Sequence, residues 1–398
     1  MDLKDTPDQA AYRQRVRAWI EEHRHEAPEL SSGLHAADPT AFRTWQGTLA
    51  DAGLVGITWP KEFGGAGLGP IEQVIVSTEL RRAGCPGIVD HIAVGNIGPT
   101  IFTYGSSAQQ ERYLGPLLHG DEGWCQLFSE PAAGSDLAGI TTRAVAQDDG
   151  TWRVTGQKVW TTMAQFADYG MLLARTDPDV PKHRGLTMFL IDMRAAGVTV
   201  RPLRQISGAA HFNEVFLDDV ELPADAVLGP VDGGWGVAMT TLMFERLALL
   251  AAFEELGWSA EDFVEPVADL PAMGDAHVRQ RIAELTTELL SLRYSAYRTL
   301  TALSRGDVPG PEAGLGKIAI INAGVQASEL IVDLLGPAAI DGRWGDLAME
   351  MPGLRSGGGT EEILRTTVGD RVLGLPPEPR VDKDVPFSEL TTGKAVAA

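Results

Sequence analysis

The chain has 398 residues, and its 22% charged and 44% hydrophobic content is that of an ordinary globular protein. Its 33 basic and 54 acidic residues give a net charge of −21 at pH 7, which argues against nucleic acid or an anionic membrane as a partner. The two cysteines, Cys85 and Cys125, lack the spacing of metal ligands, so neither a disulfide scaffold nor a metal site is expected. The polar N-terminus and the lack of an apolar run of bilayer length predict a cytoplasmic protein without membrane insertion.

Helices are predicted over the first 120 residues. The sequence T-P-D-Q at Thr6 is a capping box with proline at the first helical position, so a helix is expected to follow it. Further helices are expected after Asp38, over 70–82, and from a capping box that begins at Ser107. Residues 1–120 are therefore predicted to form a helical N-terminal domain.

The pattern changes between residues 121 and 230. Residues that favour strands gather there in short segments that are separated by Gly, Pro and Asp. These segments are 152–160, 169–174, 186–193, 198–202 and 212–217. Their length and spacing predict a central antiparallel β domain.

The helical period returns over 231–376, with helices expected at 275–305, at 311–335 and after Thr360. The last stretch, 377–398, is rich in proline and charge and is expected to form a tail over the surface. The chain is thus predicted to be an α+β protein with a helical N-terminal domain, a β domain and a C-terminal helical bundle.

One carboxylate, Glu245, lies inside the apolar helix predicted over 236–252. Residues three and four apart share a helical face, so Glu245 is expected to lie beside Ala238, Leu242, Leu249 and Ala252. Such neighbours would desolvate the carboxylate and raise its pKa, which suits a general base. A structural ion pair is the alternative, although the adjacent Arg246 points away from Glu245 on a helix.

Two segments of the predicted β domain carry groups that suit a ligand. The loop over 127–139 is rich in small residues, and the hydroxyls of Ser129 and Ser135 can donate to phosphate or carbonyl oxygens. The strand end at 156–162 places Trp160 beside Thr161 and Thr162, so an aromatic ring and two hydroxyls could meet a flat conjugated ligand. An ordinary connecting loop and a core tryptophan are the alternatives.

A third segment, G-G-G-T-E-E at 357–362, lies at an expected helix start. Glycines before an N-cap threonine expose backbone N–H groups that suit a phosphate. The glutamates of the first turn compete for the same positive helix end, so the pattern by itself is weak.

In this order, the segments resemble the acyl-CoA dehydrogenase family over about residues 5–375. The motifs that carry the resemblance are Y-G-S at Tyr104, S-E-P-x-A-G-S-D at Ser129, G-x-K-x-W-T-T at Gly156, F-N-E-V-F-L-D-D-V at Phe212, and G-G-G-T-E-E-I-L-R at Gly357. The resemblance implies three domains, 1–120, 121–230 and 231–376, with the tail 377–398, and usually a tetramer. It also implies FAD between the domains, an acyl-CoA substrate, and electron-transfer flavoprotein or a similar acceptor.

The resemblance assigns roles by position. Phe128 and Ser129 would lie against the flavin ring, with Trp160 and Thr161 beside it and Thr162 near its N5 atom. The flavin or its nucleotide would face Gly358, Gly359, Thr360 and Glu362. Ser135 would contact phosphate or the pantetheine side of the substrate, and Arg246 would also bind substrate.

Two departures from the family pattern bear on function. Most members carry the catalytic glutamate at the position that is Gly358 here, whereas isovaleryl- and long-chain-type members carry it on the helix that holds Glu245. Glu245 is therefore the expected base, which takes the α-proton while a hydride moves from Cβ to flavin N5. The segment that usually sends an arginine to the FAD of a neighbouring subunit is missing, and 258–262 brings negative charge there.

The whole pattern looks like actinobacterial members, some of which form heteromers and degrade steroids or other bulky acyl-CoA thioesters. Two alternatives stay open. One is a flavin oxidase or monooxygenase of the same fold, and the other is a non-catalytic subunit of a heteromeric dehydrogenase.

Overall fold

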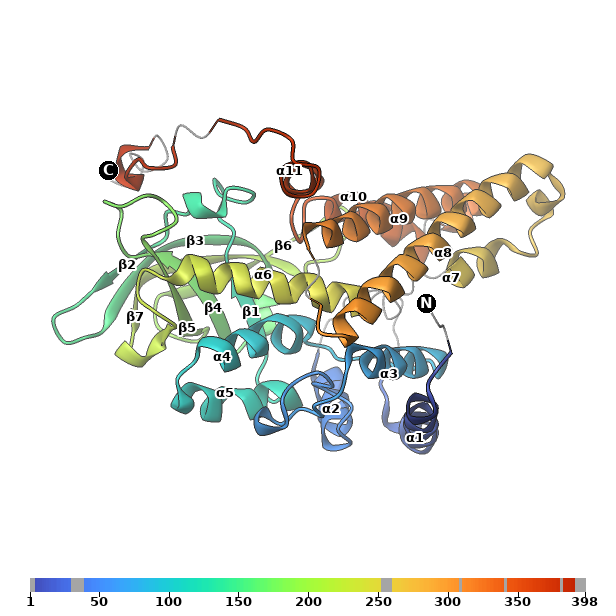
Figure 1. Cartoon of the computed structure of the whole chain (residues 1–398), viewed down its shortest axis with the longest axis horizontal. Coiled ribbons are helices and arrows are strands. Elements are labelled where there is room, and N and C mark those ends of the chain that lie inside the picture. Colours follow the sequence, from blue (N-terminus) through green and yellow to red (C-terminus); the bar gives the residue numbers. More distant parts are fainter. Residues whose placement is uncertain are drawn as a thin grey trace. The chain divides into compact units, whose positions relative to one another are not determined.

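The computed structural model of the protein describes residues 4–29, 39–251, 260–307, 310–339, 342–379 and 382–390 (Figure 1). The side chains of residues 246–251 and 343 lie outside this description, as do residues 258 and 259 of the acidic segment. The chain divides into two compact units. The first is drawn from Met1–Trp45, Ala66–Ile88 and Arg246–Pro376, and the second from Gln46–Gly65, Val89–Glu245 and Pro377–Ala398.

The second unit is built around one eight-stranded sheet, drawn in green in Figure 1. Its strands are β1 (Trp124–Leu127), β2 (Arg143–Ala146), β3 (Trp152–Thr162), β4 (Tyr169–Arg175), β5 (Leu186–Asp192), β6 (Val198–Leu203), β7 (Phe212–Leu222) and β8 (Val227–Leu228). The spatial order is β6-β7-β3-β2-β4-β5-β8, with β1 beside β4. Most pairings are antiparallel, but β1 and β2 both run parallel to β4, with Trp124 opposite Tyr169 and Arg143 opposite Arg175.

The core of this sheet is formed by inward residues of several strands. Val154, Leu172, Phe189 and Val215 are each 0% exposed. Almost every residue of β4 and β5 is buried, which is typical of central strands that are covered on both faces. The sheet therefore supplies a rigid base for the loops that leave its strand ends.

Three helices lie wholly or largely in the second unit, and the first and the last of them position Glu245. They are α4 (Gly98–Tyr104), α5 (Ser107–His119) and α6 (Gly234–Ala251), and α4 follows a π-helical turn, η3 (Ala93–Ile97). Hydroxyl pairs join α4 to α6, with Thr100 Oγ1 3.0 Å from Thr241 Oγ1 and the Tyr104 hydroxyl 2.9 Å from Thr240 Oγ1. The N-terminal part of α6 is thus fastened along α4.

The first unit is helical. Its elements include α1 (Pro7–His23), α3 (Pro70–Arg82), α7 (Ala260–Val264), α8 (Ala276–Ser304), α9 (Gly314–Leu335), α10 (Arg343–Leu354) and α11 (Glu361–Arg371), while α2 (Thr40–Asp51) crosses the boundary between the units. One hydrophobic cluster joins α7, α8, α9 and α10 through residues such as Phe263, Leu289, Leu330 and Met351. These helices make up the predicted C-terminal bundle.

The helix α9 corrects one expectation from the sequence. Pro311–Ala339 is long and apolar enough to cross a membrane: an 18-residue window within it has a mean hydropathy of 1.6, and 56% of that window is buried inside the protein. A core helix passes the same test of length and composition. Because α9 supplies Ile321, Leu330 and Ile331 to the buried cluster of the bundle, its apolar character is explained by packing.

Several predicted helix starts are confirmed in atomic detail. At α1, the Thr6 hydroxyl accepts the Gln9 N–H and the Gln9 side chain caps Thr6 in return. The helix α3 has the predicted bounds, and Thr360 caps α11. The capping box expected at Ser107 was wrong by one residue, because Ser106 is the N-cap and Gln109 completes the box.

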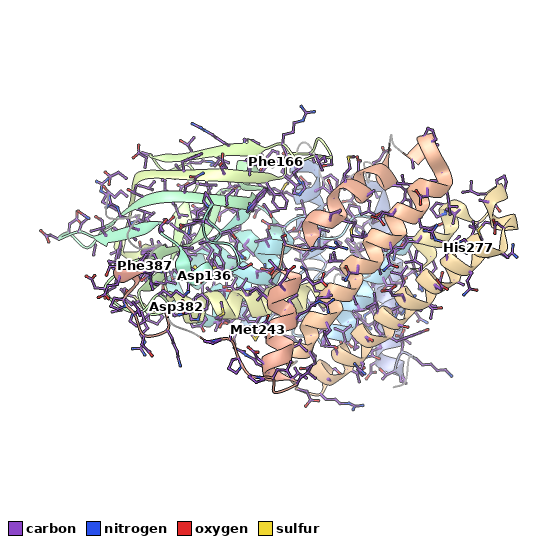
Figure 2. The ribbon with its side chains drawn as sticks, turned by 90° about the horizontal axis from the view of Figure 1, so that it is seen from above. Asp136, Phe166, Met243, His277, Asp382 and Phe387 are labelled. Atoms are coloured by element: carbon purple, nitrogen blue, oxygen red, sulfur yellow. The ribbon has the colours of Figure 1, made fainter. Side chains whose placement is uncertain are left out.

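Residues 382–390 pack onto the sheet unit, which the expectation of a surface tail over 377–398 did not include. Phe387 is 1% exposed, and the Arg175 guanidinium lies 3.7 Å from the centre of its ring. The backbone N–H groups of Phe387 and Ser388 donate to Val180 O and Pro178 O. Figure 2 shows Phe387 at the same end of the sheet as Asp136 and Asp382, so residues 382–390 form an anchor, called here the C-terminal anchor.

Replacing Phe387 by alanine tests this anchor. Loss of a buried phenylalanine and its cation–π contact is expected to lower the free energy of unfolding by about 3–5 kcal/mol, measured by chemical denaturation. The control is Glu389→Ala, in the same turn but exposed, which is expected to unfold like the wild type. Equal stability of the two variants would show that the anchor contributes nothing.

Candidate functional site

Trp160 occupies an unusual position at the end of β3. Its backbone has a φ of 58°, a left-handed conformation that is rare for a bulky residue. The register of β3 against β7 shifts between Lys158 and Thr161, which marks a β-bulge. The bulge turns the indole outwards, where it is 61% exposed and lies edge-on to Phe212. Strain of this kind is concentrated at functional sites, so an exposed tryptophan here is a candidate ligand contact.

The segment of Phe128 and Ser129 lies beside the same strand. The Val159 N–H donates to Ser129 O at 2.9 Å, and the Lys158 ammonium donates to Phe128 O at 3.0 Å. The structure thus brings Phe128 and Ser129 together with Trp160, Thr161 and Thr162, which follow directly on β3. These are the residues that the resemblance assigned to the flavin ring.

A buried ion pair holds this arrangement, and the sequence reasoning missed it. Lys158 is 0% exposed and its Nζ atom lies 2.9 Å from Glu130 Oε1; Lys158 also donates to Leu173 O at 2.7 Å. Glu130 accepts the N–H groups of Thr141 and Thr142. All three ammonium protons and both carboxylate oxygens are therefore used, which is the condition for a buried pair to be tolerated.

Burial alone would raise the pKa of Glu130, but the charge of Lys158 and the donors at Thr141 and Thr142 lower it to about 2. The carboxylate is therefore ionised throughout the physiological range. Glu130 lies in the motif S-E-P and Lys158 in the motif G-x-K. The pair could have been predicted from the sequence, because a negative and a positive residue each stand next to predicted ligand contacts.

Unsatisfied polar atoms near the bulge give a test of fit for a cofactor. The Thr161 side chain is 1% exposed, yet its hydroxyl has no hydrogen-bond partner among the described residues. The same holds for Gln126 Oε1, on the strand that leads to Phe128. An exposed indole with unpaired hydrogen-bonding atoms nearby fits a flat heteroaromatic ring with polar edges. The flavin implied by the resemblance is such a ring.

Side chains of the sheet unit hold the backbone of the loop that contains Ser135, and the Ser135 side chain is exposed. Arg175 donates to Ala138 O at 2.6 Å and to Ile140 O at 3.2 Å. Lys182 bridges Asp136, at 3.0 Å, to Asp382 of the C-terminal anchor, at 2.6 Å. Ser135 is therefore available to a ligand on a loop whose backbone is held in place.

The glycine-rich candidates belong to the first unit. Gly358 and Gly359 have φ values of +63° and +91°, which residues with side chains rarely adopt. Thr360 caps α11 by accepting the Ile363 N–H at 3.3 Å, and Lys317 donates to Gly359 O at 2.8 Å. Glu362 is exposed in the first turn. Free N–H groups at such a helix start suit the phosphate part of a nucleotide.

Glu245 lies on α6 and is half-buried. Its neighbour Phe244 packs edge-on against Phe102 of α4. Glu245 is one helical turn after Thr241, which is 0% exposed and fastened to Thr100. The carboxylate therefore projects from a helix whose preceding turn is fixed. The side chain of Arg246, the expected substrate contact, lies outside the described residues.

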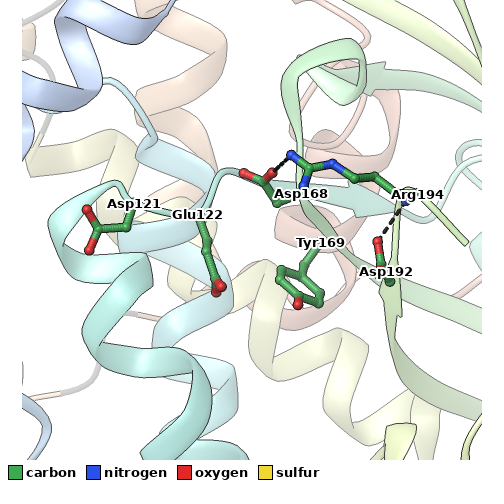
Figure 3. A pocket seen from close by; sticks show the side chains of 6 residues that line it. All are labelled: Asp121, Glu122, Asp168, Tyr169, Asp192 and Arg194. Atoms are coloured by element: carbon green, nitrogen blue, oxygen red, sulfur yellow. Dashed lines mark hydrogen bonds and ion pairs between the residues drawn. The ribbon is translucent and has the colours of Figure 1, made fainter.

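A separate surface pocket, of about 310 Å³, is lined mainly by carboxylates (Figure 3). Its lining residues are Asp121, Glu122, Asp168, Tyr169, Asp192 and Arg194. Arg194 pairs with Asp168, and Arg112 pairs with Glu122 at 2.7 Å. The predicted site residues do not line this pocket, and its negative charge does not suit the phosphates of a nucleotide or of coenzyme A.

The variant Lys158→Met tests the buried pair. It leaves Glu130 charged and buried, so we expect the free energy of unfolding to fall by about 3–5 kcal/mol, measured by chemical denaturation near neutral pH. The matched control is Arg153→Met on the same strand, whose exposed pair with Glu221 should contribute at most about 1 kcal/mol. Similar losses in the two variants would contradict the role given to Lys158.

The same pair predicts a pH dependence. The pKa of Glu130 is lowered from 4.5 to about 2 by folding, so its stabilising contribution is present above about pH 4.5 and is lost as the pH falls towards 2. The wild type is expected to lose stability more steeply across this window than a Glu130→Gln, Lys158→Met double variant. Parallel stability curves for the two proteins would contradict this prediction.

Comparison with known proteins identifies the family. Family models for the N-terminal, middle and C-terminal domains of acyl-CoA dehydrogenases match residues 6–121, 125–220 and 232–373. Acyl-CoA dehydrogenase IpdE1 of Mycobacterium tuberculosis is 35% identical over 384 residues, covering 93% of this chain and 99% of IpdE1. Acyl-CoA dehydrogenase FadE34 of the same organism is 37% identical over 369 residues, covering 92% of this chain. The match takes in 51% of FadE34, so this chain spans about half of that relative's length.

Comparison with solved structures leads to the same family. The protein titled "Tcur3481-Tcur3483 steroid ACAD" has a TM-score of 0.83 at 29% identity, covering 95% of this chain and 100% of that one. The ChsE4–ChsE5 complex from Mycobacterium tuberculosis has a chain with a TM-score of 0.76 at 26% identity, with the same coverage. The three domain matches, the fold and the exposed Trp160 beside Phe128 and Ser129 lead to one conclusion: the chain belongs to the acyl-CoA dehydrogenase family of flavoprotein oxidoreductases.

Proposed function

We propose that this chain catalyses the FAD-dependent α,β-dehydrogenation of an acyl-CoA thioester to the trans-2-enoyl-CoA, with Glu245 as the base. The observation that carries the proposal is the residue type at two positions, Gly358 and Glu245. Gly358, where most members of the family carry the base, has no side chain, whereas Glu245 is a half-buried carboxylate on the fastened helix α6. Of the two positions at which members of the family carry the base, only that of Glu245 holds a carboxylate in this chain.

The part of Glu245 in the reaction is to take the α-proton of the thioester onto a carboxylate oxygen. Partial burial favours this transfer, because a carboxylate that has lost part of its hydration is a stronger proton acceptor. The fixed turn before it, held by Thr241, limits the motion of the helix and so keeps the carboxylate in one position. Removal of the α-proton by one carboxylate oxygen needs no other titrating group.

The cofactor contacts follow from the residues gathered at the bulge. Phe128, Ser129, Trp160, Thr161 and Thr162 would hold the flavin ring. Bound FAD would supply the hydride acceptor for the Cβ–H bond. The indole of Trp160 would exclude water from one side of the flavin ring, and the hydroxyl of Thr161, which has no partner among the described residues, would offer it a hydrogen bond.

The nucleotide and substrate contacts are proposed from the remaining segments. The backbone at Gly358 and Gly359, with Thr360 and Glu362, would face the flavin or its nucleotide. Ser135 would meet a phosphate or the pantetheine chain, and Arg246 would bind substrate. Electron-transfer flavoprotein or a similar protein would accept the electrons afterwards.

Two observations favour a partner chain for this protein. Two similar structures carry paired names, Tcur3481-Tcur3483 and the ChsE4-ChsE5 complex, and the first is described as a steroid ACAD. Together with the missing arginine segment near 258–262, this supports a heteromeric assembly for the present chain and a bulky acyl group. Purification of the chain alone with stoichiometric FAD would instead support a homomer.

The variant Glu245→Gln tests the base. The amide cannot accept the α-proton, so we expect flavin content to be kept while the anaerobic bleaching rate with acyl-CoA falls by a factor on the order of 10² or more. The measurement is stopped-flow absorbance of the purified holoenzyme. Glu221→Gln, at an exposed strand end, is the control and should bleach like the wild type.

Undiminished bleaching in Glu245→Gln would remove Glu245 from this role. Rapid oxygen uptake driven by a compound that is not a thioester would favour the oxidase or monooxygenase alternative. Absence of bleaching in the wild type by any of a panel of straight, branched and cyclic acyl-CoA thioesters would favour the non-catalytic subunit.

A further inference from the structure

Asn96 is a buried amide whose hydrogen bonds are not satisfied by the protein. The residue is 4% exposed and lies in the π-helical turn η3. Its backbone oxygen accepts the Thr100 hydroxyl at 2.7 Å, but within the described residues its side-chain amide makes no hydrogen bond. The amide is not among the fully enclosed side-chain groups that lack a partner, so a molecule from outside the chain can reach it, and π-turns are frequent at functional sites. Something other than the described chain is therefore expected to meet this group.

The packing of α4 against α6 determines what lies opposite Asn96. Tyr104 pairs with Thr240, and one turn earlier on α4, Thr100 pairs with Thr241. The later residue on α4 contacts the earlier residue on α6, so the two helices are antiparallel, as Figure 1 also shows. Asn96 lies one turn before Thr100, and Glu245 lies one turn after Thr241.

Residues one turn apart share a helical face. Asn96 therefore continues the α4 face that meets α6, and Glu245 continues the α6 face that meets α4. Both residues belong to the second unit. The buried amide and the half-buried carboxylate consequently project towards the same place, one turn beyond the Thr100–Thr241 contact.

We propose that Asn96 binds an oxygen atom on the acyl group of the substrate, so that the enzyme prefers acyl-CoA thioesters with a ketone or hydroxyl oxygen beyond Cβ. This inference rests on the proposed function, because it takes Glu245 as the group that meets Cα. The amide can donate to a ketone and can both donate to and accept from a hydroxyl. A purely hydrocarbon chain would leave it buried and unpaired.

The expected preference for an oxygenated acyl group follows from the difference between a hydrogen-bonded and an unpaired Asn96 amide. A site built to hydrogen-bond a substrate oxygen discriminates against the analogue that lacks it, because the protein group is then left without a partner. We expect kcat/KM to favour the oxygenated member of a matched pair by about tenfold or more. Leucine at this position would remove the amide while keeping a side chain of similar size.

The experiment compares matched substrates with the wild type and Asn96→Leu. The pairs are hexanoyl-CoA with 5-oxohexanoyl-CoA, and cyclohexanecarboxyl-CoA with its 4-oxo derivative. Anaerobic flavin bleaching by the holoenzyme gives kcat/KM for each. The wild type should prefer the ketone of at least one pair, and Asn96→Leu should bring that ratio to one or below. Asn96→Ser, which keeps a hydrogen-bonding group, should retain part of the preference and serves if the leucine variant does not fold.

The control is Thr103→Val, which removes an exposed hydroxyl on α4 that donates to Pro99 O at 2.7 Å. It should leave both the substrate ratio and the bleaching rate unchanged. A wild type that bleaches with these substrates but shows no preference, or a preference that survives in Asn96→Leu, would overturn the inference alone. If Asn96→Leu shifted the pH profile of kcat/KM equally for both members of a pair, the inference would also be overturned. That result would show that the amide acts on Glu245 and not on the substrate oxygen. Failure of all four substrates and of the wider panel to bleach the wild type would overturn the proposed function instead.

Discussion

The buried ion pair between Lys158 and Glu130 is the interaction on which the proposed cofactor site depends. One ammonium group ties β3 to the Phe128 carbonyl, to β4 through Leu173, and to the carboxylate. The carboxylate in turn holds the backbone of Thr141 and Thr142. A charge pair of this kind contributes little net stability by itself, because desolvation offsets the attraction. Its effect is geometric, since the loop and the bulge must keep one relative position for both charges to remain satisfied.

That constraint explains why the strained backbone at Trp160 can persist. A left-handed conformation of a bulky residue costs about 1–2 kcal/mol and survives only where the surroundings fix it. Lys158 lies two residues before Trp160 with its side chain fully buried, and the Met163 N–H on the other side donates to His211 O at 2.7 Å. The indole is thus exposed by two anchored neighbours. On the helical side of the same unit, the hydroxyl pairs between α4 and α6 serve a similar purpose for Glu245.

Much of the fold could be predicted from the sequence where local chemistry decides the structure. Thr6, Pro70 and Thr360 mark helix starts because capping is a property of a few adjacent residues. The short strands β1, β2 and β8 were not predicted, since two to four residues are too few to show a period. The helix α10 was also missed, and Phe387 could not be recognised as a buried anchor because it stands alone in a proline-rich segment.

The site was predictable in part for the same reason. Glu245, Trp160 and the glycines at 358 and 359 were singled out by residue type and by resemblance to a family. The partnership of Lys158 with Glu130 joins residues 28 positions apart, and the unsatisfied amide of Asn96 is visible only when burial and hydrogen bonds are known. Positions that depend on tertiary contacts therefore had to come from the structure.

The central claim is that Glu245 removes the α-proton, and the most direct measurement separates this step from oxidation. A 3-thia-acyl-CoA has no Cβ–H bond to oxidise but can exchange its α-proton with solvent. In deuterated water, holoenzyme with Glu245 should exchange the α-proton, as followed by mass spectrometry, whereas Glu245→Gln with equal flavin content should not exceed the uncatalysed rate. Equal exchange by the two proteins would contradict the claim and place the base elsewhere in the chain.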